Sequence, residues 1–259
     1  MKRLACSMAA IALFAAGAAV AQPPSGQWWV IHEEVARPSQ LALYESSAKD
    51  FKAMVEANKA SMPTFQFHVL QGDDFHYLYA APVKNFAALD TINGEFGALM
   101  QATGGKFGEL MMRAAPATES YSETVFGNEP SMGYKPANPA VKIEDAGYFR
   151  FSFYYLEFGK EQEATAIAKD FAALFQSKGL GNGFNIYWAV NGPDLPLLAV
   201  QEWAKDEADF LATAAKIDAL VAKEIKPLNE RALAITRRLE VKSYWPRPDL
   251  SSWPAPAKK

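Results

Sequence analysis

The feature that most constrains the fold of this chain is a segment that occurs twice, 120 positions apart. Ala48-Lys49-Asp50-Phe51 returns as Ala168-Lys169-Asp170-Phe171. At both places an aromatic and β-branched run comes before the tetrapeptide and another aromatic run follows it, at a nearly constant offset. A coincidental match between two helices is the alternative, but it leaves the shared order of segments unexplained. The spacing therefore predicts an internal duplication.

The first 21 residues have the three parts of a bacterial secretory signal. The basic pair Lys2-Arg3 is followed by an apolar, alanine-rich stretch, and an A-x-A cleavage motif ends at Ala21. A membrane anchor is the alternative, but the stretch is built mostly of small residues and ends in that motif. We expect a signal peptide over residues 1–21, cleavage after Ala21, and a periplasmic or secreted product.

Composition limits what the mature chain can be. Removing 21 of 259 residues leaves 238, takes away the only cysteine, and changes the net charge from −3 to −5 because Lys2 and Arg3 are lost. Burial alone must then stabilise a chain long enough for one large core or two smaller ones. The only tight basic cluster is Arg237-Arg238, so we expect no nucleic-acid partner. We also expect no membrane contact after cleavage, and a monomer or weak oligomer.

Turn signals and periodicity divide the rest of the chain into two units of the same order. The first unit, residues 22–127, is expected to hold strand 28–35, helix 39–60, a hairpin of strands 65–70 and 75–81, helical pieces over 83–112 and strand 120–126. Residues 128–146 have the Gly and Pro content of a linker. Residues 147–246 repeat the order of the first unit, and residues 247–259 form a Pro-rich tail that we expect not to be compact.

The order β-α-β-β-α-β is the ferredoxin-like arrangement, and one such unit leaves a sheet face uncovered. We therefore predict an α+β chain of two tandem ferredoxin-like units packed sheet to sheet, with the helices outside. This arrangement resembles the dimeric α+β barrel superfamily as a fused intramolecular pair. The segment Val35-x-x-Pro38-Ser39…Tyr44-Glu45 is similar to antibiotic-biosynthesis monooxygenase and NIPSNAP-like domains. The resemblance covers about residues 27–246 and implies a fold that hosts both binding proteins and enzymes.

Alternation of side chains along a strand sorts the residues into faces. In the first strand of each unit the mostly apolar set is expected beneath the helices: Trp29, Ile31, Glu33, Val35, Phe149, Phe151, Phe153 and Tyr155. The other set is expected in a cleft between the sheets: Trp28, Val30, His32, Glu34, Tyr148, Arg150, Ser152 and Tyr154. In the second strands Gln66, His68, Asn185 and Tyr187 are expected on the cleft side. The faces of the third strands stay unassigned.

These faces give a set of ligand-binding candidates, because a mixture of aromatic and polar side chains is typical of a small-molecule cleft. The set is Trp28, His32, Glu34, Tyr148, Arg150, Tyr154 and Tyr187. The aromatic rings would hold a partly apolar or aromatic molecule. Arg150 would pair with a carboxylate or phenolate of that molecule, or with Glu34 inside the protein.

All three histidines of the chain, His32, His68 and His76, fall in the first unit. A turn over residues 71–73 would place His68 opposite His76, with His32 as a third metal ligand and Glu34 nearby. Ordinary half-buried histidines are the alternative. The candidates for catalysis are His32, His68 and Glu34, as base or ligand. We commit to no metal and expect no cofactor.

Three functions stay open on the sequence. The first is an exported protein that binds a small molecule between the two sheets. The second is a monooxygenase-like enzyme, either cofactor-free or with a His-ligated metal or haem. The third is an interaction protein whose core is closed. No nucleotide-binding loop and no hydrolase or zinc-protease motif is present to decide among them.

Overall fold

A computed structural model describes residues 25–253, so the expected signal peptide over residues 1–21 lies outside the described residues. The first half contains β1 (Trp28–Ala36), α1 (Leu41–Ala57), β2 (His68–Gly72), β3 (His76–Val83), α2 (Ala87–Ala102), α3 (Lys106–Ala114) and β4 (Thr118–Asn128). The second half contains β5 (Tyr148–Leu156), α4 (Glu161–Ser177), β6 (Phe184–Asn191), β7 (Leu197–Ala204), α5 (Glu207–Ala234) and β8 (Thr236–Pro246). The order of elements along the chain therefore agrees with the sequence prediction.

Glycine explains where the long helical stretch of the first half divides. Gly104 and Gly105 have φ values of 58° and 94°, in the left-handed region that glycine enters without steric cost. They end α2 and begin α3. Asn93 and Gly94, which also form a typical turn pair, lie inside α2 and do not interrupt it.

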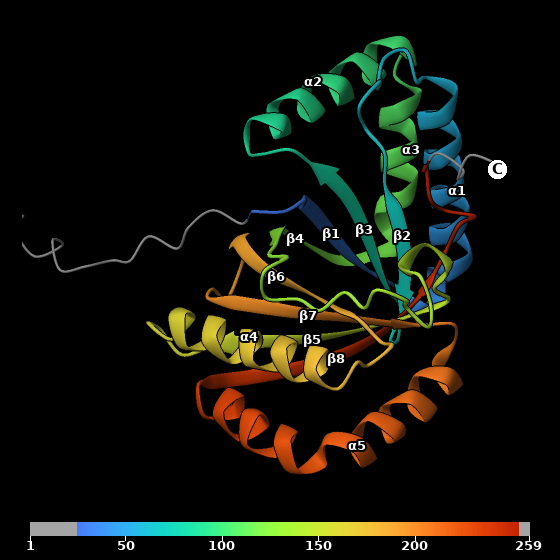
Figure 1. Cartoon of the computed structure of the whole chain (residues 1–259). Coiled ribbons are helices and arrows are strands. Elements are labelled where there is room, and N and C mark those ends of the chain that lie inside the picture. Colours follow the sequence, from blue (N-terminus) through green and yellow to red (C-terminus); the bar gives the residue numbers. More distant parts are fainter. Residues whose placement is uncertain (1–24, 254–259) are drawn as a thin grey trace, which may run out of the picture.

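The eight strands form one closed barrel in the neighbour order β1-β3-β2-β8-β5-β7-β6-β4 (Figure 1). The halves meet edge to edge, because β2 pairs with β8, placing Gln71 opposite Trp245, and β4 pairs with β6, placing Phe126 opposite Ala189. The prediction of two ferredoxin-like sheets packed face to face is wrong. Stacked sheets would expose unpaired backbone N–H and C=O groups at their edges, and pairing the outer strands into a barrel satisfies those groups.

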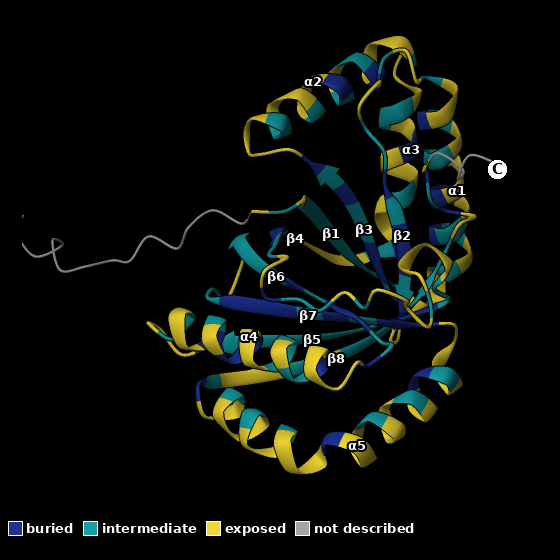
Figure 2. Cartoon of the chain, in the orientation of Figure 1, coloured by how far each residue is buried: buried dark blue, intermediate teal, exposed yellow. Residues whose placement is uncertain are grey.

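The helices form an outer layer, with α1, α2 and α3 beside the first half and α4 and α5 beside the second (Figure 1). Their outward faces are exposed, whereas β7 is buried along most of its length (Figure 2). Side chains of both halves meet inside the barrel in two apolar clusters. The buried members of these clusters are Leu70, Leu78, Phe149, Trp203, Tyr244, Phe126, Leu197 and Ala199.

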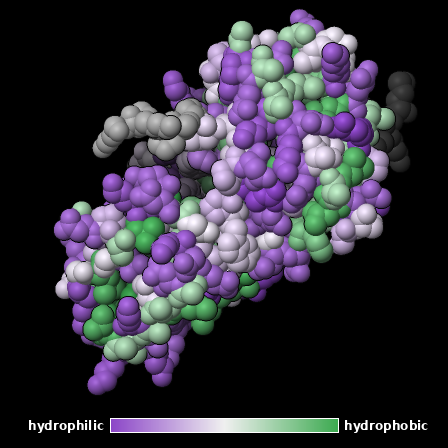
Figure 3. Space-filling model, turned by 90° about the vertical axis from the view of Figure 1, so that its right-hand side faces the viewer, coloured by the Kyte–Doolittle hydropathy of each residue, from purple (hydrophilic) through white to green (hydrophobic). Residues whose placement is uncertain are grey.

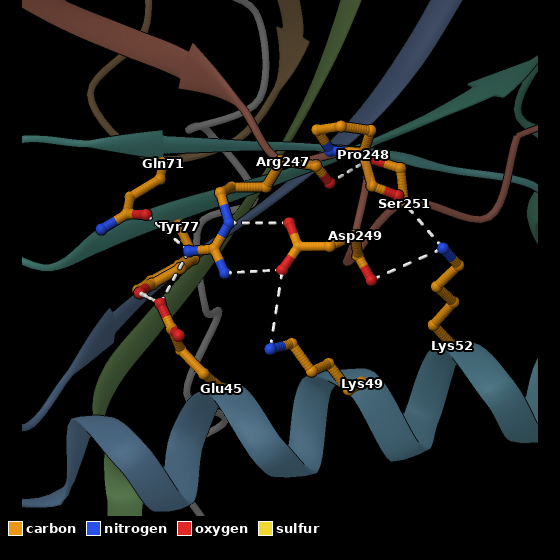
Figure 4. A network of polar contacts seen from close by, with 9 residues as sticks. All are labelled: Glu45, Lys49, Lys52, Gln71, Tyr77, Arg247, Pro248, Asp249 and Ser251. Atoms are coloured by element: carbon orange, nitrogen blue, oxygen red, sulfur yellow. Dashed lines mark hydrogen bonds and ion pairs between the residues drawn. The ribbon is translucent and has the colours of Figure 1, made fainter.

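The C-terminal segment, residues 247–253, packs against the first half, so the expectation of a non-compact tail is wrong for these residues. Leu250 is fully buried, and Ser252 is 2% exposed. The guanidinium of Arg247 donates hydrogen bonds to Glu45 of α1 and to Gln71 of β2 (Figure 4). Proline prevents regular structure here but not packing. Residues 254–259 of the predicted tail lie outside the described residues.

On the face drawn in Figure 3, hydrophilic residues dominate, and hydrophobic residues form small separate patches. Among residues 25–253, no helix combines the length and the apolar character needed to cross a bilayer.

Candidate functional site

The faces of β1 and β5 are reversed relative to the sequence prediction. His32 and Glu34 lie opposite Tyr79 and Tyr77 of β3, and these tyrosines pack in the core beneath α1. The hydroxyl of Tyr44 in α1 donates a hydrogen bond of 2.5 Å to Glu34, which places this carboxylate on the helix side. Alternation fixes the phase of a strand but not which face is outside. The more hydrophobic set occupies the barrel interior instead.

The β2 and β6 strands follow the prediction. Val69 of β2 and Phe67, which directly precedes β2, pack in the core beneath the helices, as do Phe184 and Ile186 of β6. On the inner face, Tyr187 and Asn185 both donate hydrogen bonds to Gln201 Oε1, at 2.9 and 3.0 Å. Apolar side chains of both halves pack together on this inner face, so the interior of a closed barrel stands where a cleft between two sheets was predicted.

A cavity of about 210 Å³ lies on the outer side of the second half, between α4, α5 and the sheet. Helix α4 contributes Ala164, Ile167, Ala168, Phe171 and Phe175 to its walls. The remaining apolar lining residues are Leu156, Phe184, Ile186, Leu198, Val200, Ile225, Ala232 and Ile235. Apolar walls with a few polar groups are characteristic of small-molecule sites.

The polar groups on the sheet side of this cavity come from two neighbouring strands. Tyr154 and Ser152 project from β5, and Glu202 projects from β7. Leu198, Val200 and Glu202 alternate with inward-facing residues along β7, so a single acidic position in an otherwise apolar strand reaches the cavity. Asn229 of α5 and Thr236 of β8 complete the polar lining.

Burial controls the ionisation of Glu202. Burial raises the pKa of this carboxyl above its ordinary value, and Arg150, which lies opposite it in the β5–β7 ladder, offsets only part of the rise. The pKa of Tyr154 is raised as well, first by burial and then by the negative charge of Glu202. The Arg150 Cζ lies 5.3 Å from the centre of the Phe210 ring of α5. Perturbed groups beside an apolar cavity mark a candidate functional site.

The corresponding layer of the first half is filled by aromatic side chains. Rings of Phe51, Phe65, Phe67, Phe96 and Phe107 contact one another at centroid distances of 4.9–6.4 Å. In the second half, Phe171 occupies the position equivalent to Phe51 in the repeat, but its ring borders the cavity rather than a cluster of aromatic rings. This difference depends on packing between segments far apart in sequence, so the sequence pattern did not reveal it.

The structure places the three histidines at separate positions. His32 lies 3.1 Å from Glu34 and 3.2 Å from Glu123, and the ring of His68 stacks on Trp253 at 3.8 Å. His68 lies opposite Ala80 rather than His76, because the β2–β3 register differs from the one predicted. Within residues 25–253, no group of three or more His, Cys, Asp or Glu side chains is arranged to hold a metal ion. The predicted metal ligands are therefore not brought together.

A charged cluster that the sequence did not reveal lies inside one end of the barrel. Glu33 Oε1 accepts hydrogen bonds from His76 Nδ1 at 2.9 Å, Lys242 Nζ at 2.8 Å and the Tyr244 hydroxyl at 3.3 Å. Burial raises the pKa of Glu33, but Lys242 and His76 outweigh it and lower the pKa below its ordinary value. Since Lys242 follows Glu33 by 209 residues, no local pattern could predict this pair.

The remaining predicted ligand-binding residues are dispersed. Trp28 contacts Phe86 edge-on at 5.0 Å, and Tyr148 is buried against Phe210 and Trp245. Burial raises the pKa of Tyr187, inside the barrel, to about 12. Tyr154 is the only residue of the predicted set that lines the cavity. Arg150 does not line it but lies opposite Glu202, which does.

Comparison with known proteins gives one consistent result. No protein-family model matches the sequence, and no curated protein matches it. Solved structures match most of the chain, among them the following three. An anthrone oxidase-like protein is 12% identical, with a TM-score of 0.58, over 85% of this chain and 91% of its own. A monooxygenase candidate from Lactobacillus acidophilus is 10% identical, with a TM-score of 0.52, over 88% and 96%. Chlorite dismutase from Candidatus Nitrospira defluvii is 9% identical, with a TM-score of 0.52, over 86% and 92%.

These proteins belong to the dimeric α+β barrel superfamily. The chain has the dimeric α+β barrel fold. At 9–12% identity the likeness establishes the fold and not the activity. The resemblance noted in the sequence is confirmed at this level, and the fused tandem pair stays a prediction.

A His-ligated haem, which the sequence left open as a cofactor, would need a histidine and enough volume in the cavity. None of the three histidines lines the cavity, and about 210 Å³ is small. Cofactor pockets typically enclose roughly 300–1,000 Å³. The residues present therefore do not fit a His-ligated haem here.

Proposed function

We propose that this protein is exported and binds a small, partly apolar or aromatic molecule in the cavity beneath α4 and α5. One observation carries the proposal: apolar walls from α4, α5 and the sheet enclose a space in which Glu202 and Tyr154 supply polar groups. Burial of apolar ligand surface would drive binding, and the polar groups would orient the molecule.

The volume limits the ligand. An apolar cavity of roughly 150 Å³ is known to hold benzene. A cavity of about 210 Å³ therefore suits one substituted ring or two fused rings. The predicted aromatic character of the ligand is kept, but its place moves from between the sheets to beneath the helices.

Calorimetric titration of the purified protein with 2-naphthol tests the proposal. Ala168→Phe should abolish binding because the new ring fills the cavity that Ala168 lines. Ala166→Phe is the matched control, since it makes the same change on the exposed side of the same helix. Absence of binding by the unaltered protein, to 2-naphthol and to naphthalene, would contradict the proposal and favour a non-binding interaction protein.

A monooxygenase-like enzyme is the second candidate, and the buried Glu202 carboxyl favours it. In its ionised form a buried carboxyl can accept a proton from a bound molecule, and the raised pKa of Glu202 makes its carboxylate a stronger base. 1-Naphthol is the probe, because its two fused rings match the volume of the cavity. Dioxygen would supply the new carbonyl oxygen of 1,4-naphthoquinone and leave its second oxygen as water. Oxygen uptake above the spontaneous rate, lost in Glu202→Gln, would favour the enzyme, and uptake equal to buffer would contradict it.

A further inference from the structure

The cavity lining contains an acidic residue and no basic one. Glu202 is the only Asp or Glu among the lining side chains, and no Lys, Arg or His lines the cavity. Arg150 is the charged residue opposite Glu202, but its guanidinium lies over the Phe210 ring and does not line the cavity. A molecule inside the cavity therefore meets the carboxyl group of Glu202 and no basic side chain.

The Glu202 carboxyl also lacks a hydrogen-bond donor. Among the described residues, no side chain or backbone group donates a hydrogen bond to the Glu202 carboxyl. None of these residues forms a hydrogen bond with the Tyr154 hydroxyl either. Both side chains line the cavity and are only partly exposed, so a ligand that supplies the missing hydrogen-bond partner gains affinity. A ligand hydroxyl can do both, by donating to Glu202 and accepting from Tyr154.

We propose that the cavity selects uncharged aromatic molecules whose hydroxyl or amino group donates a hydrogen bond to the Glu202 carboxylate, and that it rejects aromatic carboxylates. This inference rests on the proposed function. It replaces the sequence hypothesis in which Arg150 meets a ligand carboxylate. A carboxylate ligand would place a second negative charge beside Glu202 in a region of low dielectric constant, where repulsion is poorly screened.

Arg150 acts here as a positioning residue. Its positive charge favours the ionised form of Glu202, which burial disfavours, and no other charged group faces this carboxyl from β5, β7, α4 or α5. Tyr154 is the remaining titratable group at the site, and its pKa is raised, so it stays neutral. Arg150 thereby keeps the hydrogen-bond acceptor charged at lower pH than burial alone would allow.

Three ligands of similar size test the selection: 2-naphthol, naphthalene and 2-naphthoate. Calorimetry with the full mature protein should show the tightest binding for 2-naphthol and binding of 2-naphthoate weaker by about 100-fold. In Glu202→Gln, affinity for 2-naphthol should fall about tenfold, because a charge-assisted bond becomes a neutral one. Discrimination against 2-naphthoate should shrink in the same variant. Glu240→Gln, an isosteric change on β8 outside the cavity lining, should leave all three affinities unchanged.

The pH profile separates positioning from a structural role. Affinity for 2-naphthol should fall as the pH drops through the pKa of Glu202 in the folded protein. In Arg150→Gln this fall should occur at higher pH, and Arg150→Lys should restore the original profile because it keeps the charge. Thermal melting of each variant identifies one that fails to fold.

The outcomes are distinguishable. Equal affinity for 2-naphthol and 2-naphthoate, unchanged in Glu202→Gln, would overturn the selection while leaving the cavity as a binding site. Failure of all three ligands to bind would overturn the proposed function and the selection with it.

Discussion

The Arg247 Nη1 lies 2.6 Å from the Glu45 Oε1, and this contact joins the C-terminal segment to α1. The same nitrogen donates to Gln71 Oε1 at 2.6 Å, while two other guanidinium nitrogens bond both oxygens of Asp249 at 2.9 Å. Tyr77 donates to the same Glu45 oxygen at 2.9 Å (Figure 4). Arg247 follows directly after β8, so these contacts hold the end of the second half against the first.

Arg247→Gln should lower the free energy of unfolding by about 1.5–3 kcal/mol, because it removes charge-assisted hydrogen bonds from a guanidinium that is only 19% exposed. Urea unfolding followed by circular dichroism measures the change. Arg113→Gln is the control, since Arg113 pairs with Asp50 where both side chains are half exposed, and less than about 1 kcal/mol should be lost there. Equal losses in the two variants would contradict the argument.

His32→Gln should reduce stability more in acid than in base. Burial lowers the pKa of His32, but Glu34 and Glu123 outweigh it and raise the pKa above its ordinary value. The stabilisation is therefore complete below about pH 6.5 and is lost as the pH rises through the pKa in the folded state. Urea unfolding at about pH 5.5 and 8.5 should show a difference that vanishes at the higher pH.

His68→Gln is the matched control with the opposite sign. Burial lowers the pKa of His68, so the unfolded chain binds its proton more readily, and the contribution of this residue to stability rises with pH. Parallel trends in the two variants would count against the assignment of both shifts.

Ala168→Phe and Ala48→Phe make the same change at equivalent positions of the repeat. Ala168 lines the cavity, whereas Ala48 lies in the filled core beneath α1. Overpacking should cost Ala48→Phe about 1–3 kcal/mol, and Ala168→Phe should cost less because its ring enters open space. Thermal and urea unfolding compare the two. A larger loss for Ala168→Phe would show that the cavity does not admit a ring.

Glu95→Ala should destabilise the first half. The Glu95 carboxylate of α2 is 7% exposed and accepts hydrogen bonds from the Thr64 hydroxyl at 2.6 Å and from the backbone N–H groups of Thr64 and Phe65 at 3.1 and 3.0 Å. Removing the carboxylate leaves these three donors without their hydrogen-bond acceptor, which should lower the free energy of unfolding by about 2–4 kcal/mol. Glu109→Ala, on the exposed side of α3, is the control, and hydrogen exchange at residues 64 and 65 should localise the effect.

Export is tested on the full-length chain. Expressed in a bacterium, the protein should appear in the periplasmic or extracellular fraction with Gln22 as its first residue, because the small-residue motif that ends at Ala21 directs cleavage there. N-terminal sequencing and fractionation measure this. Ala21→Phe should block processing, whereas a protein found in the cytoplasm with an intact N-terminus would contradict the prediction.

Part of the candidate site could be predicted and part could not. Alternation along β5 singled out Tyr154 together with Arg150, and both lie on the same face of that strand, as expected. Glu202 was missed, because an isolated acidic residue in an apolar strand has no distinctive local pattern. The one feature of the sequence that could have indicated Glu202 is a charged residue among the alternating apolar positions of β7.

The order of strands and helices follows from the sequence alone, because it depends on short-range periodicity and on turn residues such as Gly104 and Gly105. Three features emerge only from the folded molecule: β2 joins β8 and β4 joins β6 into a barrel, Phe149 and Phe151 face inward, and a cavity remains beside Glu202. Both faces of β5 carry apolar rings, so alternation gave the phase but no direction. The direction was fixed by pairing and packing between segments a hundred or more residues apart.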